Sequence, residues 1–82
     1  MSNILVIDDD ADICTLLNRF LSKNGFTVTT AYSGKAALES IINNVPDIVL
    51  CDFRLEDMNG SELLEKIKQN NPQVPVIIMT GY

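Results

Sequence analysis

Two short apolar runs, each followed by an aspartate, constrain the fold of this chain more than any other feature. They are residues 4–7, followed by Asp8, and residues 48–51, followed by Asp52. Four apolar residues in succession are typical of a strand buried on both faces, as the central strands of a parallel sheet are. Open α/β sheets carry their chemistry at the carboxyl ends of such strands. The two aspartates are therefore the first candidates for a functional site.

Three helices are predicted between the strands. Each has apolar residues at the i, i+3 and i+4 spacing of an amphipathic helix. Each also follows a residue that caps helices well: Asp9 or Asp10, then Ser33, then Asn59. The positions expected to face the core are Ile13, Leu16, Leu17, Phe20 and Leu21 in the first helix, Ala37, Leu38, Ile41 and Ile42 in the second, and Leu63, Leu64 and Ile67 in the third.

Two further strands complete the pattern. Residues 27–32 are β-branched but more polar, as expected near the edge of a sheet, and residues 76–79 follow a proline that a strand tolerates at its start. The resulting order βαβαβαβ, with right-handed crossovers, predicts an α/β fold with a parallel sheet and helices on both faces. No linker or repeat interrupts the sequence, so residues 1–82 are expected to lie in one domain.

Composition excludes several classes of protein. With 46% hydrophobic and 21% charged residues, the chain is typical of a globular domain. No apolar run is long enough to span a membrane and the N-terminus does not resemble a signal peptide, so we expect a cytoplasmic protein without membrane contact. The absence of histidine excludes catalysis by an imidazole of its own. Cys14 and Cys51 form no CxxC pair and are expected to be core residues.

Acidic residues account for the net charge of −5 and gather in two places. Four aspartates lie within residues 8–12, and Asp52, Glu56 and Asp57 follow the second apolar run. Such a surface repels a phosphate backbone, so we expect no direct contact with nucleic acid. A cation is the ligand that this charge favours.

Parallel strands end at the same edge of a sheet, which brings together the polar residues that follow three of the predicted strands. These residues are Asp8, Asp9, Asp52 and Thr80. Carboxylates within a few ångströms of one another repel, and a bound cation relieves the repulsion. A small set of oxygen ligands suits Mg²⁺, and the EF-hand spacing of a calcium site is absent. Magnesium beside a carboxylate nucleophile and a hydroxyl indicates phosphoryl chemistry.

Four segments occur in the order and spacing of one known family. They are Val6-Ile7-Asp8-Asp9-Asp10, Asp47-Ile48-Val49-Leu50-Cys51-Asp52, Met58-Asn59-Gly60-Ser61-Glu62-Leu63-Leu64 and Pro75-Val76-Ile77-Ile78-Met79-Thr80-Gly81. With them, residues 3–82 resemble the receiver domain of bacterial two-component response regulators. The resemblance implies a flavodoxin-like, CheY-like doubly wound parallel sheet. The sheet is incomplete here, because the family continues with a further helix, strand and helix, and residues 1–82 would be the N-terminal portion of the domain. The ending Met79-Thr80-Gly81-Tyr82 is most similar to regulators that work with the alternative sigma factor, sigma-54.

The resemblance implies a role for each site residue. Asp52 matches the phosphoacceptor, which takes a phosphoryl group from a phosphohistidine on a sensor histidine kinase or a histidine phosphotransfer protein. Asp8 and Asp9 match the acidic pair that holds Mg²⁺, and Arg54 matches the position whose backbone carbonyl completes the metal shell. Thr80 matches the hydroxyl that turns toward the phosphoryl group. The domain would be no enzyme, but a switch for an effector domain of the full protein, commonly a DNA-binding domain that regulates transcription.

Some features depart from the family pattern. The fifth strand of the family carries a lysine that pairs with the phosphoryl group, and no counterpart lies within these residues. Residues 76–79 would then form an exposed hydrophobic edge, through which we expect self-association or marginal folding. Glu56 replaces a proline that is common in the turn after the phosphoacceptor. Asp10 and Asp57 match no family ligand and are expected only to cap and solvate.

Three alternative functions compete with this one. A Rossmann nucleotide site needs a glycine-rich first turn, whereas residues 8–10 are aspartates that would repel a pyrophosphate. An aspartate-nucleophile phosphohydrolase would also use Mg²⁺ and Asp52, but that family has a second aspartate where Arg54 stands. The remaining alternative is a phosphorylation-incompetent receiver fragment that acts only as an interaction or assembly module.

Overall fold

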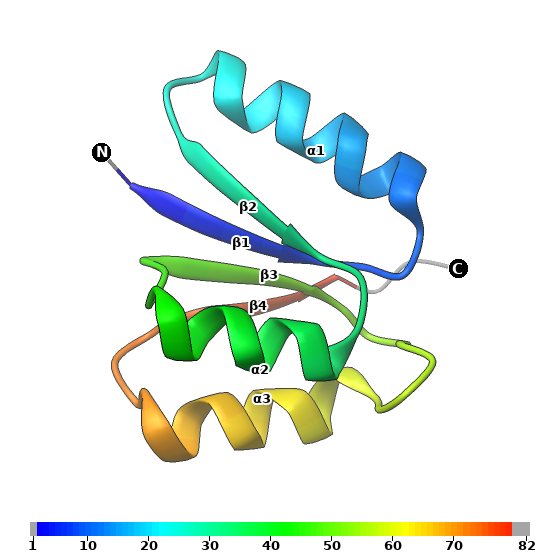
Figure 1. Cartoon of the computed structure of the whole chain (residues 1–82), viewed down its shortest axis with the longest axis vertical. Helices are drawn as coiled ribbons and strands as arrows, with labels where there is room; N and C mark the ends of the chain where they lie inside the picture. The colour runs from blue at the N-terminus through cyan, green and yellow to red at the C-terminus, as the bar shows by residue number, and fades with distance from the viewer. Residues whose placement is uncertain (1, 80–82) are drawn as a thin grey trace.

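Strands and helices alternate along the chain, as the sequence predicts (Figure 1). The computed structural model describes residues 2–79. The predicted strands at residues 27–32 and 76–79 agree with the observed ones to within one residue. The elements are β1 (Asn3–Ile7), α1 (Ala11–Lys23), β2 (Thr27–Ala31), α2 (Gly34–Asn43), β3 (Ile48–Asp52), α3 (Gly60–Asn70) and β4 (Val76–Met79).

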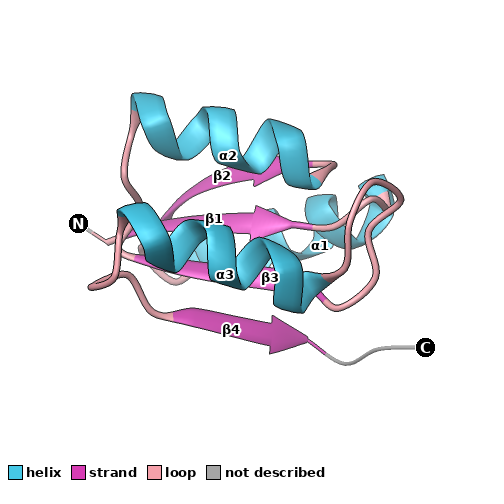
Figure 2. Ribbon diagram, turned by 90° about the horizontal axis from the view of Figure 1, so that it is seen from below, coloured by secondary structure: helices cyan, strands magenta, loops and turns pink. Residues whose placement is uncertain are grey.

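The strands form one parallel sheet in the order β2-β1-β3-β4. The polar strand β2 lies at one edge, as predicted, and β4 lies at the other edge of the described sheet. α1 covers one face, whereas α2 and α3 lie together on the other face (Figures 1 and 2). The strand order changes direction between β1 and β3, and sheets of this kind bind ligands at the carboxyl end of that junction.

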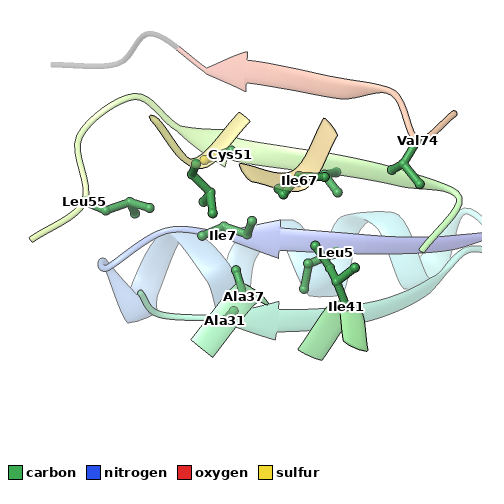
Figure 3. Packing of buried hydrophobic residues seen from close by; sticks show 11 residues of the cluster. Leu5, Ile7, Ala31, Ala37, Ile41, Cys51, Leu55, Ile67 and Val74 are labelled. Carbon is green, nitrogen blue, oxygen red and sulfur yellow. The ribbon is translucent and has the colours of Figure 1, made fainter. Parts of the chain in front are cut away.

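The strand residues alternate between two cores of unequal size. Leu5 and Ile7 of β1 face α2 and α3, where they join the larger core cluster (Figure 3). Ile4 and Val6 face α1, and Cys14 is the one residue of α1 that is fully buried. β1 is therefore buried on both faces, as its continuous apolar sequence predicts, whereas β3 is buried toward α2 and α3 and only half-buried on the opposite face.

The expectation that the whole apolar stripe of α1 lies in the core is wrong. Ile13, Leu16 and Phe20 are 40%, 66% and 62% exposed. The residues that face the sheet are instead Cys14 and the half-buried Leu17 and Leu21. Each follows one of the three exposed residues by one position, which turns it by about 100° around the helix. α1 packs mainly on β1 and β2, and this contact leaves the outer flank of its stripe exposed.

The stripes of α2 and α3 agree with expectation except at one position. Ala37 and Ile41 of α2 and their counterparts Leu63 and Ile67 of α3 are buried in the larger core. Ile42, however, is 82% exposed, so its predicted inward orientation is wrong. It follows Ile41 by about 100° around the helix, and the buried strip of α2 is too narrow to include both.

The helix caps form at the predicted residues. Asp10 caps α1, and its side chain accepts hydrogen bonds from the backbone N–H of Asp12 at 2.9 Å and of Ile13 at 3.4 Å. Ser33 and Asn59 cap α2 and α3 in the same manner. These caps begin each helix immediately after the carboxyl edge of the sheet, where the acidic residues gather.

Candidate functional site

The carboxyl ends of β1, β3 and β4 border an open hollow of about 480 Å³. It lies beside the junction between β1 and β3, where the strand order changes direction. Its lining consists of Asp8, Asp9, Asp10, Ile13, Asp52, Arg54 and Met79.

Three of the predicted site residues meet in this hollow. Asp8, Asp9 and Asp52 each place one carboxylate oxygen within 4.8 Å of the others. Asp8 is buried, Asp52 is half-buried and Asp9 is exposed. The cluster therefore runs from the interior of the protein to the solvent, and its outer side is open to a ligand.

The sheet holds these carboxylates in place through the backbone. Asp8 donates its backbone N–H to the Ala31 carbonyl at 3.1 Å, which extends the pairing of β1 with β2. Asp52 is the last residue of β3 and pairs with Met79 of β4. Because Asp52 belongs to a strand pair and Asp8 is hydrogen-bonded to the end of β2, the sheet sets their separation.

The pKa of Asp8 is raised above its ordinary value. Burial is the largest cause, and the negative charges of Asp52, Asp9 and Asp10 act in the same direction. A hydrogen bond from the Asp10 backbone N–H, 3.0 Å from Oδ1 of Asp8, opposes them. A cluster of this kind has an electrostatic cost that a cation would relieve. Its oxygen atoms are the ligands that hard divalent cations prefer.

Both cysteines are buried and free, as the sequence predicts, and both contact the backbone of the cluster. The Cys14 thiol donates to the Asp8 carbonyl at 3.3 Å, and the Cys51 thiol donates to the Asp52 carbonyl at 3.2 Å. Burial, and then the nearby Asp52 and Asp8 charges, raise the pKa of Cys51 to about 11. Burial also raises the pKa of Cys14. The thiols therefore stay protonated and act as small core side chains.

The loop between β3 and α3 folds tightly against the end of β3. Arg54 pairs with Asn59 in an isolated antiparallel bridge, and the Gly60 N–H donates to the Phe53 carbonyl at 2.7 Å. A Cβ atom at Gly60 would lie 3.1 Å from both the Asp52 carbonyl oxygen and the Phe53 Cα, so this close approach favours glycine. The loop keeps Arg54 at the border of the hollow beside Asp52.

The other acidic residues and Thr80 have different places. Asp10 caps α1, as expected, and Thr80 lies outside the described residues. Asp57 also acts as a cap, but it does so on α2, whose first two residues precede it by 23 and 22 positions. Sequence reasoning missed this contact because no local pattern links the two segments.

Comparisons with known proteins identify the family. The model of the response regulator receiver domain matches residues 4–82, and the chain therefore belongs to that family, as its motifs predict. The crystal structure of response regulator protein TrrA from Thermotoga maritima in complex with Mg(2+)-BeF is similar to this chain, with a TM-score of 0.94 and 30% identity. That match covers 100% of this chain and 71% of the other. The incomplete flavodoxin-like, CheY-like sheet is thereby confirmed.

The curated relatives are longer proteins. The transcriptional regulatory protein ZraR of Escherichia coli (strain K12) is 48% identical over 80 residues, and the DNA-binding transcriptional regulator NtrC of the same strain is 43% identical over 79 residues. These matches cover 98% and 96% of this chain, but the chain spans 18% and 17% of the two relatives. Both are named as transcriptional regulators, and both are sigma-54 regulators, the subfamily that the ending of the chain resembles. No helix within residues 2–79 is long and apolar enough to cross a membrane.

Proposed function

We propose that this chain is the phosphoacceptor domain of a two-component response regulator. In this role Asp52 receives a phosphoryl group from a phosphohistidine of a sensor histidine kinase or a histidine phosphotransfer protein. The observation that carries the proposal is the meeting of Asp8, Asp9 and Asp52 within 4.8 Å, at the carboxyl edge of a receiver fold. The TrrA relative, whose structure contains Mg(2+)-BeF, supports the same chemistry.

The residues of the hollow fit Mg²⁺. Its proposed ligands are the carboxylates of Asp8, Asp9 and Asp52, directly or through water, and the backbone carbonyl of Arg54. This set is all oxygen and leaves room for water and a phosphoryl oxygen, whereas calcium takes six to eight ligands. When bound, the ion would neutralise negative charge on the transferred group.

Asp52 has the position that a nucleophile needs. It ends a central strand, is half-buried, and borders an open hollow, so a partner can reach it. One carboxylate oxygen forms the bond to phosphorus while the bond from phosphorus to the imidazole nitrogen breaks, and the imidazole keeps that electron pair. The chain contains no histidine, so the donor must be a partner. Because the acceptor is its own side chain, we propose that the domain is a signalling switch and not an enzyme.

The remaining roles follow from the family. We propose that the Thr80 hydroxyl hydrogen-bonds the phosphoryl group, whose charge of about −1.5 to −2 attracts nearby donors. The readout would pass to an effector domain of the full protein, which is DNA-binding if the likeness to NtrC extends to it. Such a regulator acts on transcription in the cytoplasm. The acidic surface of this segment itself opposes contact with nucleic acid.

The alternative of a phosphorylation-incompetent interaction module is not favoured. An assembly module has no need for carboxylates that repel one another, and the burial of Asp8 beside Asp52 and Asp9 costs stability when nothing is bound. Retention of all three carboxylates therefore favours a working phosphoacceptor.

The test is a titration with Mg²⁺ and then with beryllofluoride, which imitates the phosphoryl group on Asp52, followed by NMR. We expect Mg²⁺-dependent shifts at the amides of Asp8, Asp9 and Thr80. We also expect a beryllofluoride response that disappears in Asp52→Asn while its Mg²⁺-free spectrum stays folded. A folded wild-type chain that responds to neither reagent would overturn the proposal and support the interaction module.

We also propose that residues 1–82 on their own, without the further strand that the family carries, self-associate through β4. This strand lies at an edge of the described sheet, and Ile77 on it is half exposed. Unpaired backbone groups on a hydrophobic edge can pair with another chain. Sedimentation should show a mass that rises with concentration, whereas a stable monomer with cooperative unfolding would contradict this proposal.

A further inference from the structure

The loop between β3 and α3 is fastened to the start of α2 by one carboxylate. Oδ1 of Asp57 accepts a hydrogen bond from the Gly34 backbone N–H, and Oδ2 accepts one from the Lys35 backbone N–H, each at 2.9 Å. Asp57 is 23 and 22 positions away from these residues in the sequence. The side chain therefore joins two segments that only the tertiary fold brings together.

Asp57 completes the cap of α2. The first N–H groups of a helix have no partner inside it. Here the Ser33 hydroxyl accepts from Ala36 at 3.0 Å, and the Ser33 carbonyl accepts from Ala37 at 3.0 Å. Two N–H groups remain in this turn, those of Gly34 and Lys35, and both donate hydrogen bonds to Asp57. Both hydrogen bonds lower the pKa of Asp57, as expected of a carboxylate at a helix N-terminus.

A second contact closes the same junction. A Cβ atom at Gly34 would lie 2.6 Å from Cγ and Sδ of Met58, so the Met58 side chain occupies the space that glycine leaves open. Met58 packs against the larger core, and its carbonyl accepts from the Leu55 N–H at 3.2 Å. Asp57 and Met58 thus bind adjacent parts of the α2 N-terminus, one through polar atoms and one through apolar atoms.

The consequence concerns the candidate site. The loop contains no proline to restrict its backbone, and it begins at the residues next to Asp52. It is held at its base by the pairing of Arg54 with Asn59 and at its tip by Asp57. We propose that Asp57 is a positioning residue: by fastening the β3–α3 loop to α2, it holds Arg54 beside Asp52 and so sets the affinity of the site for Mg²⁺. This inference rests on the proposed function.

The experiment compares two variants of Asp57 with one control variant, and all three remove one negative charge from this loop. Asp57→Asn removes the charge and weakens the bidentate contact, and Asp57→Ala removes the contact entirely. Glu56→Gln is the matched control, since the Glu56 side chain makes no hydrogen bond within residues 2–79. The Mg²⁺ dissociation constant is measured by NMR titration at a temperature at which circular dichroism shows every variant to be folded. The Gly34 and Lys35 amides report the contact directly.

We expect Asp57→Ala to weaken Mg²⁺ binding several-fold and Asp57→Asn by less, with Glu56→Gln close to wild type. The effect is smaller than the roughly 10- to 100-fold typical of groups that touch a metal ligand, because Asp57 acts through the loop. Equal affinities in wild type and both Asp57 variants, with the Gly34 and Lys35 amides visibly perturbed, would overturn the inference and leave a purely structural cap. A wild type that binds no Mg²⁺ would overturn the proposed function itself, and this inference with it.

Discussion

Two aspartates of this protein occupy opposite kinds of environment. Asp8 is 4% exposed, is crowded by other carboxylates, and has a raised pKa. Asp57 is exposed, accepts two backbone N–H groups at the start of α2, and has a lowered pKa. The comparison teaches that the surroundings, and not the residue type, decide whether a carboxylate stabilises the fold by itself or needs a bound cation to balance its charge.

The difference follows from what each carboxylate faces. Asp57 meets the positive end of a helix dipole and two N–H donors, so its charge is satisfied by the protein itself. Asp8 receives one N–H, from Asp10, and otherwise faces Asp9 and Asp52. Its charge therefore favours a cation bound from outside the chain. We therefore regard the Asp8 cluster as the site and Asp57 as part of its support.

The largest expected effect is on metal binding at the cluster. Asp8→Asn removes a proposed ligand and should weaken Mg²⁺ binding by roughly 10- to 100-fold or more, a larger loss than any Asp57 variant causes. Asp10→Asn is the control: it removes a neighbouring charge but keeps an equally good helix cap. The dissociation constants come from NMR titration. If Asp10→Asn loses as much affinity as Asp8→Asn, the site responds to general charge and not to ligation.

The next effect is on folding stability at the other aspartate. Asp57→Ala leaves two N–H groups of α2 without their partner and should lower the free energy of unfolding by about 1 kcal/mol, the usual cost of losing a helix cap. Urea unfolding followed by circular dichroism measures this loss. Glu56→Ala, on the adjacent exposed residue, should change stability by no more than about 0.5 kcal/mol. Equal losses in the two variants would mean that the cap contributes nothing specific.

Substitution of Asp8, unlike that of Asp57, should raise the free energy of unfolding when Mg²⁺ is absent. In Mg²⁺-free buffer, Asp8→Asn relieves repulsion with Asp9 and Asp52 and should raise the free energy of unfolding by up to about 1 kcal/mol. Addition of Mg²⁺ should reverse the order, because the wild type gains more from binding. The same urea titration, with and without Mg²⁺, provides the measurement. A destabilised Asp8→Asn in both buffers would show that the cluster is not under electrostatic strain.

The smallest expected effect is the pH dependence of stability. The folded pKa of Asp8 is above its ordinary value of 3.8, so the folded state binds the proton more readily, and stability rises as pH falls through the raised pKa. The folded pKa of Asp57 is below 3.8, so its contribution is present above that value and is lost as pH falls below it. In Mg²⁺-free buffer, urea midpoints should rise less on mild acidification in Asp8→Asn than in wild type. At lower pH they should fall less in Asp57→Asn. Identical pH profiles for the three proteins would remove the contrast between the two aspartates.

Sequence patterns predict the site better than they predict the packing of the helices. Asp8 and Asp52 could be placed together because each ends a continuous apolar run, and parallel strands align their carboxyl ends. The same kind of reasoning placed Ile13 and Ile42 in the core, where the structure leaves both exposed. A period of 3.6 identifies an apolar stripe, but it cannot say which part of a wide stripe the neighbouring element covers.

The sequence by itself determined the order of strands and helices, their caps, the family, and the three carboxylates of the site. These depend on local periodicity, on single capping residues, and on motifs whose spacing is continuous in the chain. The tertiary structure alone decided which line of α1 faces the sheet, why the pKa of Asp8 rises while that of Asp57 falls, and that Asp57 fastens its loop to α2. Each of these results from contacts between distant segments, and the hydrogen bonds and burial that they create exist only once the strands and helices have packed.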